Sequence, residues 1–448
     1  MVLIVLLWSG ARAPTPRAAF WSALALGTGY FATAMSWIVE PFLVDAARHG
    51  WMAPFALAGM AAGMALFWAV PVALARRVLR PYALAAPLFL SLAEWARHWL
   101  FTGLPWAAPG QVLIDTPLAQ AAAFIGVLGL SAVLFFAASQ LITRRWIAAL
   151  VLLVNAALPA RNSATPPDTG QIVRLIQPNA EQAKKWDREW MPVFFNRALE
   201  LSAAPGPRDL VVWPETALPS LLGHAPELEA RVRAAAGVPV IVGTRRMQGT
   251  RFYNSMALLG SEQVYDKRHT VPFGEYVPFG DALGRLGIRG LAVRDGFGYS
   301  SGQGAALMDL PGGLGRALPL ICYEAIFPRD LAAFAGRADW ILQATNDAWF
   351  GTRSGPQQHL AQARFRAIEQ GLPFLRAANT GISAVIDARG RVLAHLPLNT
   401  AGHLDAALPG ALPPTLFSRW GNAPLLVLLA ALCVVLIALP RPVSRPTH

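Results

Sequence analysis

Charged residues are scarce in this chain of 448 residues. Asp, Glu, Lys and Arg make up 14% of the sequence, and 54% of the residues are hydrophobic. An ordinary soluble protein carries roughly 25% charged residues. A chain this apolar is not soluble along its whole length, so we expect much of it to lie in a lipid bilayer.

Cysteine is nearly absent, with only Cys322 and Cys433 present, and Cys433 lies in an apolar run near the C-terminus. A scaffold built on disulfides is therefore excluded. The eight histidines are isolated and form neither an HxH nor an HExxH pattern. We therefore expect no metal site.

The net charge of +12 does not indicate nucleic-acid binding. The arginines are scattered or lie between apolar runs, and they form no basic stripe. Membrane topology and anionic lipid explain the excess better. We therefore expect no nucleic-acid partner.

Several apolar runs are long enough to cross a bilayer, which takes about 20 residues. The predicted spans are 18–38, 51–75, 81–101, 117–141, 146–160 and 423–440. The apolar start Met1–Trp8 is too short to span. It fits either a signal peptide or the stub of a helix, and the lack of basic residues before it favours the stub.

The arginines of the short loops predict the topology. Arginine-rich loops are retained in the cytoplasm, and here they alternate with loops that are poor in arginine. This places the polar region outside, in the periplasm if the cell is Gram-negative. We expect a helical membrane domain over 1–160, a periplasmic domain over 161–420, and a final helix with a cytoplasmic tail over 421–448.

Three polar residues, Glu94, Arg97 and His98, lie near the outer end of the third predicted span. Two interpretations are open. They form an interfacial belt anchored by neighbouring tryptophans such as Trp106, or they line a polar passage next to the outer domain.

The outer region alternates short apolar runs with helical stretches, which is typical of one α/β domain. Helices are expected over 183–203, 225–236 and 357–371, the last ending at Gly371. The expected strands are QIVRLIQPN, DLVVWPE, VPVIVGTRR, FYNSMALLG, ALPLICYE, DWILQATND, FLRAAN and ISAVIDARG.

Glu215, Lys267 and Cys322 each follow an apolar strand. Taken singly, the first two are typical of turns and solvated ends, and a lone cysteine is usually a small core residue. Together they supply the thiol, base and oxyanion partner that nucleophilic acyl transfer needs. A neighbouring lysine is also expected to lower the pKa of the thiol.

At these residues the sequence resembles the nitrilase, or carbon–nitrogen hydrolase, superfamily, and more closely the family of apolipoprotein N-acyltransferases. The motifs that carry the resemblance are WPETALP (213–219), YDKRHTVPFGEYVPFG (265–280), ICYEAIFP (321–328), NDAWFG (346–351), AANTGIS (377–383), GYFATAMSWIVEPF (29–42) and EWARHWLFTGLPW (94–106). The resemblance implies a nitrilase-like α-β-β-α sandwich after a polytopic helical membrane domain. The family usually has eight spans, two of them before 10–17, where this chain has only the short apolar start.

The resemblance also implies a reaction. Glu215 acts as the base, Cys322 takes an acyl chain from a membrane phospholipid such as phosphatidylethanolamine as a thioester, and Lys267 stabilises the oxyanion. The acyl chain then passes to the amine of diacylglyceryl-cysteine on an apolipoprotein. No cofactor or metal is needed, and the implied enzyme lies in the bacterial inner membrane. Nothing in the sequence demands more than a monomer, so we expect a monomer.

Four further residues are carried over from the family pattern as supporting or substrate-binding residues. They are Glu275, Tyr323, Glu324 and Trp186. Glu275 is expected to orient Lys267, Glu324 to support the nucleophile, Tyr323 to act through its backbone, and Trp186 to lie near the substrate entrance. Structural ion pairs and ordinary packing remain the alternatives for these positions.

Two other functions fit parts of the sequence. A membrane-tethered amidase or nitrilase would keep the three reactive residues and use water as the acceptor. A membrane scaffold or transporter would need none of them, but the predicted spans lack the paired charges and broken helices that transport usually requires.

Overall fold

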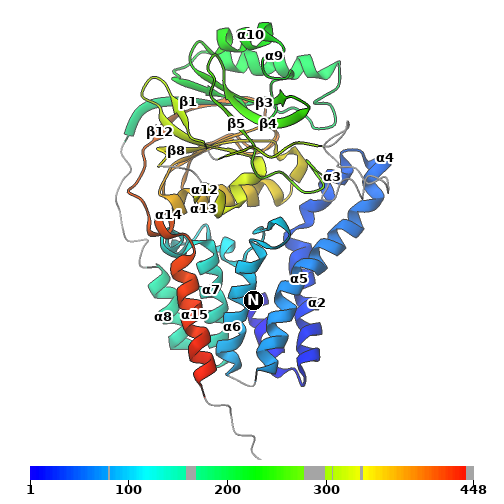
Figure 1. Ribbon diagram of the computed structural model, residues 1–448, viewed down its shortest axis with the longest axis vertical. Helices are drawn as coiled ribbons and strands as arrows, with labels where there is room; N and C mark the ends of the chain where they lie inside the picture. The colour runs from blue at the N-terminus through cyan, green and yellow to red at the C-terminus, as the bar shows by residue number, and fades with distance from the viewer. Residues whose placement is uncertain (79–80, 158–167, 277–297, 305, 333–336, 440–448) are drawn as a thin grey trace, which may run out of the picture. The chain divides into compact units, whose positions relative to one another are not determined.

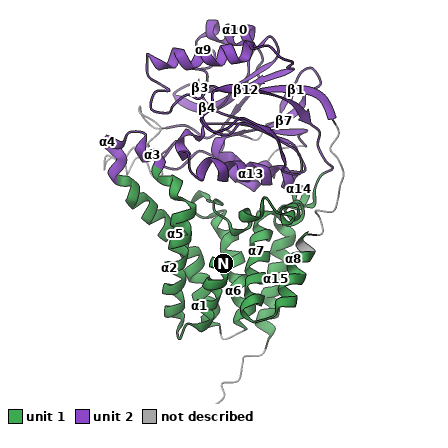
Figure 2. Cartoon of the chain, turned by 180° about the vertical axis from the view of Figure 1, so that it is seen from behind, with its two compact units in different colours: residues 1–39, 52–164, 414–448 green, residues 40–51, 165–413 purple. Residues whose placement is uncertain are grey.

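The computed structural model describes residues 1–78, 81–157, 168–276, 298–304, 306–332 and 337–439. Two compact units make up the chain, and Figure 2 shows them in different colours. The first comprises residues 1–39, 52–164 and 414–448, and the second comprises 40–51 and 165–413. The loop residues 40–51, which include the short helices α3 (Glu40–Leu43) and α4 (Ala46–His49), thus group with the second unit.

The first unit is helical. Its main helices are α1 (Val2–Arg12), α2 (Pro16–Ala34), α5 (Ala53–Arg77), α6 (Tyr82–Arg97), α7 (Ala122–Ile142), α8 (Trp146–Ala157), α14 (Leu416–Trp420) and α15 (Ala423–Ala438). Helix α2 begins where the sequence signals a start, because Thr15 accepts a hydrogen bond from the Ala18 N–H and proline occupies the first helical position.

Among the described residues, two helical segments are long and apolar enough to cross a membrane, Ala46–Arg77 and Pro117–Ile142. Pro16–Ala34 and Ser36–Leu43, which are bent by 67° relative to each other, form a third such segment if they are counted as one span. Helices α6 and α15 have 16 residues each. The expected spans 81–101, 146–160 and 423–440 therefore stay predictions, and parts of the last two lie outside the described residues.

The polar residues of α6 are buried within the first unit. The carboxylate of Glu94 accepts hydrogen bonds from Trp68 and Arg97, and Arg97 also donates to the carbonyl oxygens of Leu104 and Trp106. The exposed fractions of Glu94 and Arg97 are 0% and 1%. Both side chains are therefore enclosed within the first unit, and the interfacial and passage interpretations both stay predictions.

The second unit contains two six-stranded sheets, and they form the expected α-β-β-α sandwich. In Figure 1, α9 (Trp190–Ala203) and α10 (Pro226–Ala236) cover one sheet, and α12 (Pro328–Ala332) and α13 (Gly355–Gln370) cover the other. One sheet has the order β12 (Gly402–Pro409), β1 (Asp168–Gln177), β2 (Leu210–Val212), β3 (Val240–Gln248), β4 (Arg251–Leu258), β5 (Val264–Asp266). The other has the order β11 (Val392–His395), β10 (Ala384–Ile386), β9 (Phe374–Ala378), β8 (Trp340–Thr345), β7 (Gly315–Ile321), β6 (Met308–Leu310).

The first helix of this unit differs from the prediction. It was expected from residue 183 but begins at Trp190, and the preceding residues form turns. The Lys185 side chain in these turns donates hydrogen bonds to the Glu215 carbonyl oxygen and the Thr216 hydroxyl. The chain therefore bends toward the end of β2 instead of continuing the helix. Helix α13 ends as predicted, because Gly371 adopts a left-handed conformation and caps it.

Candidate active site

The three reactive residues come from both sheets. Glu215 follows β2 and Lys267 follows β5 in one sheet, whereas Cys322 follows β7 in the other. All three are at least nine-tenths buried. The sandwich thus brings two strand ends of one sheet to a strand end of its partner.

The structure places Glu215 and Lys267 next to each other, with 3.6 Å between the Lys267 Nζ and Glu215 Oε1 atoms. Glu215 Oε1 accepts a hydrogen bond from the Asn254 amide at 2.7 Å, and Oε2 accepts one from the Asn346 backbone N–H at 2.9 Å. Both carboxylate oxygens are therefore fixed, one by a donor in β4 and the other by a donor that directly follows β8.

The Lys267 ammonium also donates to Glu275 Oε1 at 2.9 Å. Burial alone would lower the pKa of Lys267, but the carboxylates of Glu275 and Glu215 raise it above its ordinary value. Lys267 is therefore a fixed cation across the physiological pH range, which suits it to stabilise negative charge.

Cys322 is buried and has a φ of +50°, in the left-handed region that non-glycine residues rarely adopt. Lys267 lowers the pKa of the Cys322 thiol, as expected, but the net shift is upward. Burial and the nearby Glu215 carboxylate raise this pKa, and they outweigh the opposite effects of Lys267 and of a hydrogen bond to Thr345. The resting residue is a thiol, so it needs a base to become a nucleophile.

A buried polar network that the sequence did not suggest lies behind Cys322. The Cys322 carbonyl oxygen accepts a hydrogen bond from Gln343 at 2.8 Å and lies 3.2 Å from His359 Nε2. The Asp347 carboxylate lies 2.9 Å from His359 Nδ1 and accepts a hydrogen bond from Arg376. Gln343 lies in β8, Asp347 in the short 3-10 helix after it, His359 in α13 and Arg376 in β9. Among the motifs quoted from the sequence, only NDAWFG contains one of them, Asp347.

Of the expected supporting residues, Glu275 and Glu324 both lie at the site. Glu275 bonds Lys267, as described, and also accepts from the Val271 N–H. Glu324 accepts hydrogen bonds from the backbone of Arg268 and His269, which follow Lys267, and from Ile321, which precedes Cys322. It therefore ties the lysine loop to the cysteine loop.

Burial raises the pKa of Glu324 to about 7, although its hydrogen bonds from Ile321 and Tyr265 act in the opposite direction. Tyr323 is buried beside His269 and Phe327 in edge-to-face ring contacts. The Tyr323 side chain thus packs against the residues that follow Lys267 and Cys322.

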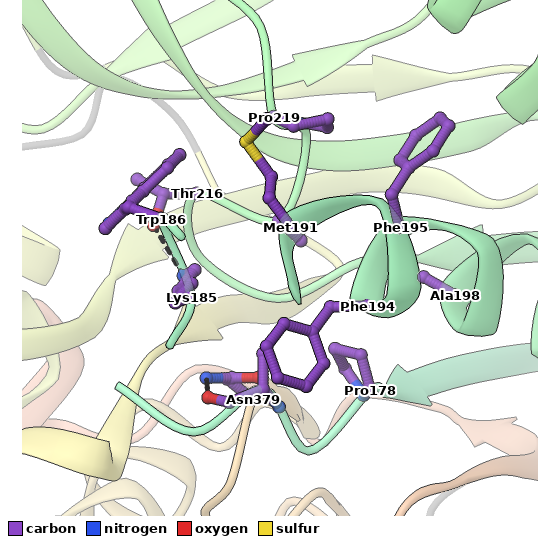
Figure 3. Close-up of a pocket in the computed structure, with 12 residues that line it drawn as sticks. Pro178, Lys185, Trp186, Met191, Phe194, Phe195, Ala198, Thr216, Pro219 and Asn379 are labelled. Atoms are coloured by element: carbon purple, nitrogen blue, oxygen red, sulfur yellow. Dashed lines mark hydrogen bonds between the residues drawn. The ribbon is translucent and has the colours of Figure 1, made fainter. Parts of the chain in front are cut away.

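Trp186 is 38% exposed and lines a pocket with Lys185, Thr216, Phe194 and other residues (Figure 3). Thr216 directly follows Glu215, so this pocket adjoins the reactive residues. Lys185 was placed in a helix by the sequence and was not expected at the site. The feature of the sequence that could have indicated Lys185 is its position next to Trp186 in the segment KKWD.

In the part of the chain that the structure describes, no group of three or more His, Cys, Asp or Glu side chains is arranged to hold a metal ion. The site contains a buried thiol, buried carboxylates and a buried lysine. A thiol beside a fixed carboxylate and a fixed cation can attack a carbonyl carbon and stabilise the resulting oxyanion. The class that fold and site define is that of the carbon–nitrogen hydrolases.

Comparisons with known proteins agree with this class. Residues 172–412 match the family Carbon-nitrogen hydrolase, and residues 1–140 match the family Apolipoprotein N-acyltransferase N-terminal domain. An apolipoprotein N-acyltransferase of Rhodopseudomonas palustris is 38% identical, over 97% of this chain and 88% of its own length. One of Allorhizobium ampelinum is 41% identical over 86% of this chain and 79% of its own length.

Among solved structures, a CN-hydrolase superfamily protein of Xanthomonas campestris with an arsenic adduct in its active site is 18% identical, with a TM-score of 0.40. The match covers 61% of this chain and 99% of that one. The sequence relatives decide the assignment: the chain belongs to the apolipoprotein N-acyltransferase family. Membership and the apolar helices make it a membrane protein.

Proposed function

We propose that this chain transfers an acyl chain from a membrane phospholipid to the N-terminal amine of diacylglyceryl-cysteine on apolipoproteins. The family supports lipoprotein N-acylation. The observation that carries the mechanism is the contact of Glu215 and Lys267, 3.6 Å apart, together with the electrostatic effect of both groups on the buried thiol of Cys322. An enzyme with these groups can hold an acyl chain as a thioester between two substrates.

In the first half-reaction, Glu215 accepts the proton of the Cys322 thiol as the sulfur attacks the ester carbonyl carbon of the phospholipid. The oxyanion of the tetrahedral intermediate is stabilised by the Lys267 ammonium and by a backbone N–H near Tyr323. The ester C–O bond then breaks, and the leaving alkoxide takes the proton back from Glu215. A lysophospholipid departs, and the acyl group remains on Cys322.

In the second half-reaction, the α-amine of the acceptor attacks the thioester carbonyl and gives one proton to Glu215. The C–S bond breaks, an amide forms, and the thiolate takes that proton to restore the thiol. The raised pKa of Cys322 fits this cycle, because the thiol stays protonated in the free enzyme and gives its proton to Glu215 only as the sulfur attacks a carbonyl carbon.

The cellular setting belongs to the same proposal. Phosphatidylethanolamine is the expected donor, diacylated apolipoproteins are the acceptors, and the monomeric enzyme lies in the bacterial inner membrane. The domain over 161–420 faces the periplasm, between the membrane domain over 1–160 and the final helix over 421–448. The arginine distribution of the short loops supports this orientation.

The test is intact-mass analysis of the purified protein after incubation with phosphatidylethanolamine in detergent micelles. We expect one added acyl mass on the wild type and on Cys433→Ala, and none on Cys322→Ala. Cys433 is the matched control because it is the other free cysteine and is only partly buried. A diacylated lipopeptide should then remove the acyl mass and become N-acylated.

Two results would contradict the proposal. An acyl mass on Cys322→Ala would place the nucleophile elsewhere. A folded wild type that gains no acyl mass from phospholipid, yet hydrolyses a soluble amide such as propionamide without lipid, would instead support a membrane-tethered amidase.

A further inference from the structure

Two cationic side chains lie against the indole ring of Trp186. The guanidinium carbon of Arg245 is 4.4 Å from the ring centroid, and the ammonium of Lys185 is 5.6 Å from it. Figure 3 shows Trp186 and Lys185 together at the pocket next to Thr216. Two cations close to the same ring repel each other, so a site that keeps both of them there favours an anion as a third partner.

Arg245 has no acidic partner among the residues that the structure describes. Its Nε atom is buried there without a hydrogen-bond partner. The next residue in β3, Arg246, is paired with Asp266 at 3.0 Å. Arg245 lies opposite Asn254 in the β3–β4 pair, so the two side chains project from the same face. Asn254 holds the Glu215 carboxylate, so Arg245 borders the reactive residues.

In the described part of the chain, the ammonium of Lys185 has no hydrogen bond to a carboxylate. Its ammonium donates to the Glu215 carbonyl oxygen at 3.0 Å and to the Thr216 hydroxyl at 2.8 Å, both neutral acceptors. Burial lowers the pKa of Lys185 to about 8. The negative charge of Glu215 raises this pKa, and the positive charge of Arg245 lowers it further. An anion placed between the two cations would relieve this repulsion.

We propose that Lys185 and Arg245, positioned at the ring of Trp186, bind the phosphodiester of the acyl donor. This inference rests on the proposed function. In a phospholipid, only the glycerol backbone separates the phosphate from the reacting ester, and Lys185 bonds the backbone of Glu215, which adjoins the nucleophile. Arginine and lysine are the residues that hold phosphate oxygens most strongly. The subsite would select a phospholipid over a neutral lipid ester.

Arg245 is the residue to change, because Lys185 also holds the backbone of Glu215. The experiment measures acylation of Cys322 by two donors in detergent micelles. One is phosphatidylethanolamine and the other is p-nitrophenyl palmitate, a neutral ester that gives the same thioester. Arg245→Gln removes the charge, Arg245→Lys retains it, and Arg251→Gln removes an exposed arginine from the same hairpin as a control.

Arg245→Gln should raise KM for phosphatidylethanolamine about tenfold, the loss expected for a charge-assisted hydrogen bond. KM for p-nitrophenyl palmitate should change by less than twofold. Arg245→Lys should recover most of the loss, and Arg251→Gln should behave as the wild type with both donors. The split between the donors is the readout that a merely structural role would not produce.

An unchanged KM for phosphatidylethanolamine in Arg245→Gln would overturn the phosphate subsite. An equal rise with both donors would also overturn it, because the residue would then only shape the site. If neither ester acylates the wild type, the proposed function itself is wrong. If only p-nitrophenyl palmitate acylates the wild type, the thioester chemistry is supported, whereas the phospholipid donor and the phosphate subsite are both refuted.

Discussion

The Nζ atom of Lys267 lies 2.9 Å from the Oε1 atom of Glu275, and both side chains are buried. Glu275 rather than Glu215 is thus the direct hydrogen-bond acceptor of the lysine. Under the proposed mechanism, one carboxylate positions the cation and the other remains available as the base. The two roles would conflict in a single residue, because a base bound tightly to an ammonium is a poor proton acceptor.

Glu275→Gln should therefore slow acylation of Cys322 about 100-fold, the scale of losing one oriented electrostatic group in an active site. The neutral amide would hold the ammonium less firmly and would free it to bind Glu215. Rapid-quench mass analysis of thioester formation measures this rate. Glu262→Gln, an exposed glutamate two residues before β5, should leave the rate unchanged. A rate for Glu275→Gln within threefold of the wild type would refute the positioning role.

The raised pKa of Glu324 predicts opposite pH effects on stability and activity. A glutamate in an unfolded chain has a pKa of about 4.3, whereas burial raises that of Glu324 to about 7. Between these values the folded protein keeps a proton that the unfolded chain releases. The stabilisation from this group is therefore present at low pH and is lost as the pH rises through about 7.

The ionised form, in contrast, is the better acceptor for the N–H groups of Arg268, His269 and Ile321, which hold the lysine and cysteine loops. Thioester formation should rise about fivefold between pH 6 and 8, the difference between neutral and charge-assisted hydrogen bonds. Glu324→Gln should lose this step and keep a flat, lower profile. If the variant retains the step with the same midpoint, Glu324 is not its source.

The residues at the strand ends are the part of the site that could be predicted from the sequence. Glu215, Lys267 and Cys322 each follow a recognisable apolar run, and the sandwich brings those ends together. Lys185 was hidden because its segment has a helical pattern, and a tertiary hydrogen bond to Glu215 overrides that pattern. The left-handed backbone of Cys322 has no sequence signal, because glycine would normally mark such a position.

The network behind the nucleophile was hidden for a different reason. His359 lies in α13 among other polar residues, Asp347 follows β8, and Arg376 interrupts the apolar strand β9. Nothing in these local sequences indicates that the three side chains meet. Their contacts exist only when β8, α13 and β9 pack together. Edge strands such as β11 and β12 were also missed, since their half-exposed residues do not form the apolar runs that mark the central strands.

Gly243 of β3 provides the space that the Glu215 backbone occupies. A Cβ atom at Gly243 would lie 2.3 Å from the Pro214 carbonyl oxygen and 2.6 Å from the Glu215 Cα atom. Backbone atoms at such distances have to move, and a displacement of about 1 Å in a catalytic group can cost roughly 100-fold in rate. Gly243→Ala should therefore slow acylation by about that factor.

The measurement is single-turnover acylation by p-nitrophenyl palmitate, with circular dichroism to verify that the variant is folded. The matched control is Gly304→Ala, because a Cβ atom there meets nothing within 4 Å. A Gly243→Ala variant as fast as the control would show that Glu215 tolerates the shift or is not the base.

The buried pair of Glu94 and Arg97 in α6 should act on stability rather than on transfer. Glu94→Leu leaves the Arg97 guanidinium without a carboxylate, and such a loss costs about 3–5 kcal/mol in a buried pair. The retention of folded protein after heating in detergent, measured by size-exclusion chromatography, should fall accordingly, whereas Arg145→Leu, at an exposed position, should have little effect. Below its melting temperature, the Glu94→Leu variant should still acylate Cys322 within threefold of the wild-type rate. A variant that keeps its thermal stability but loses transfer would instead indicate that Glu94 lines a polar passage for a substrate.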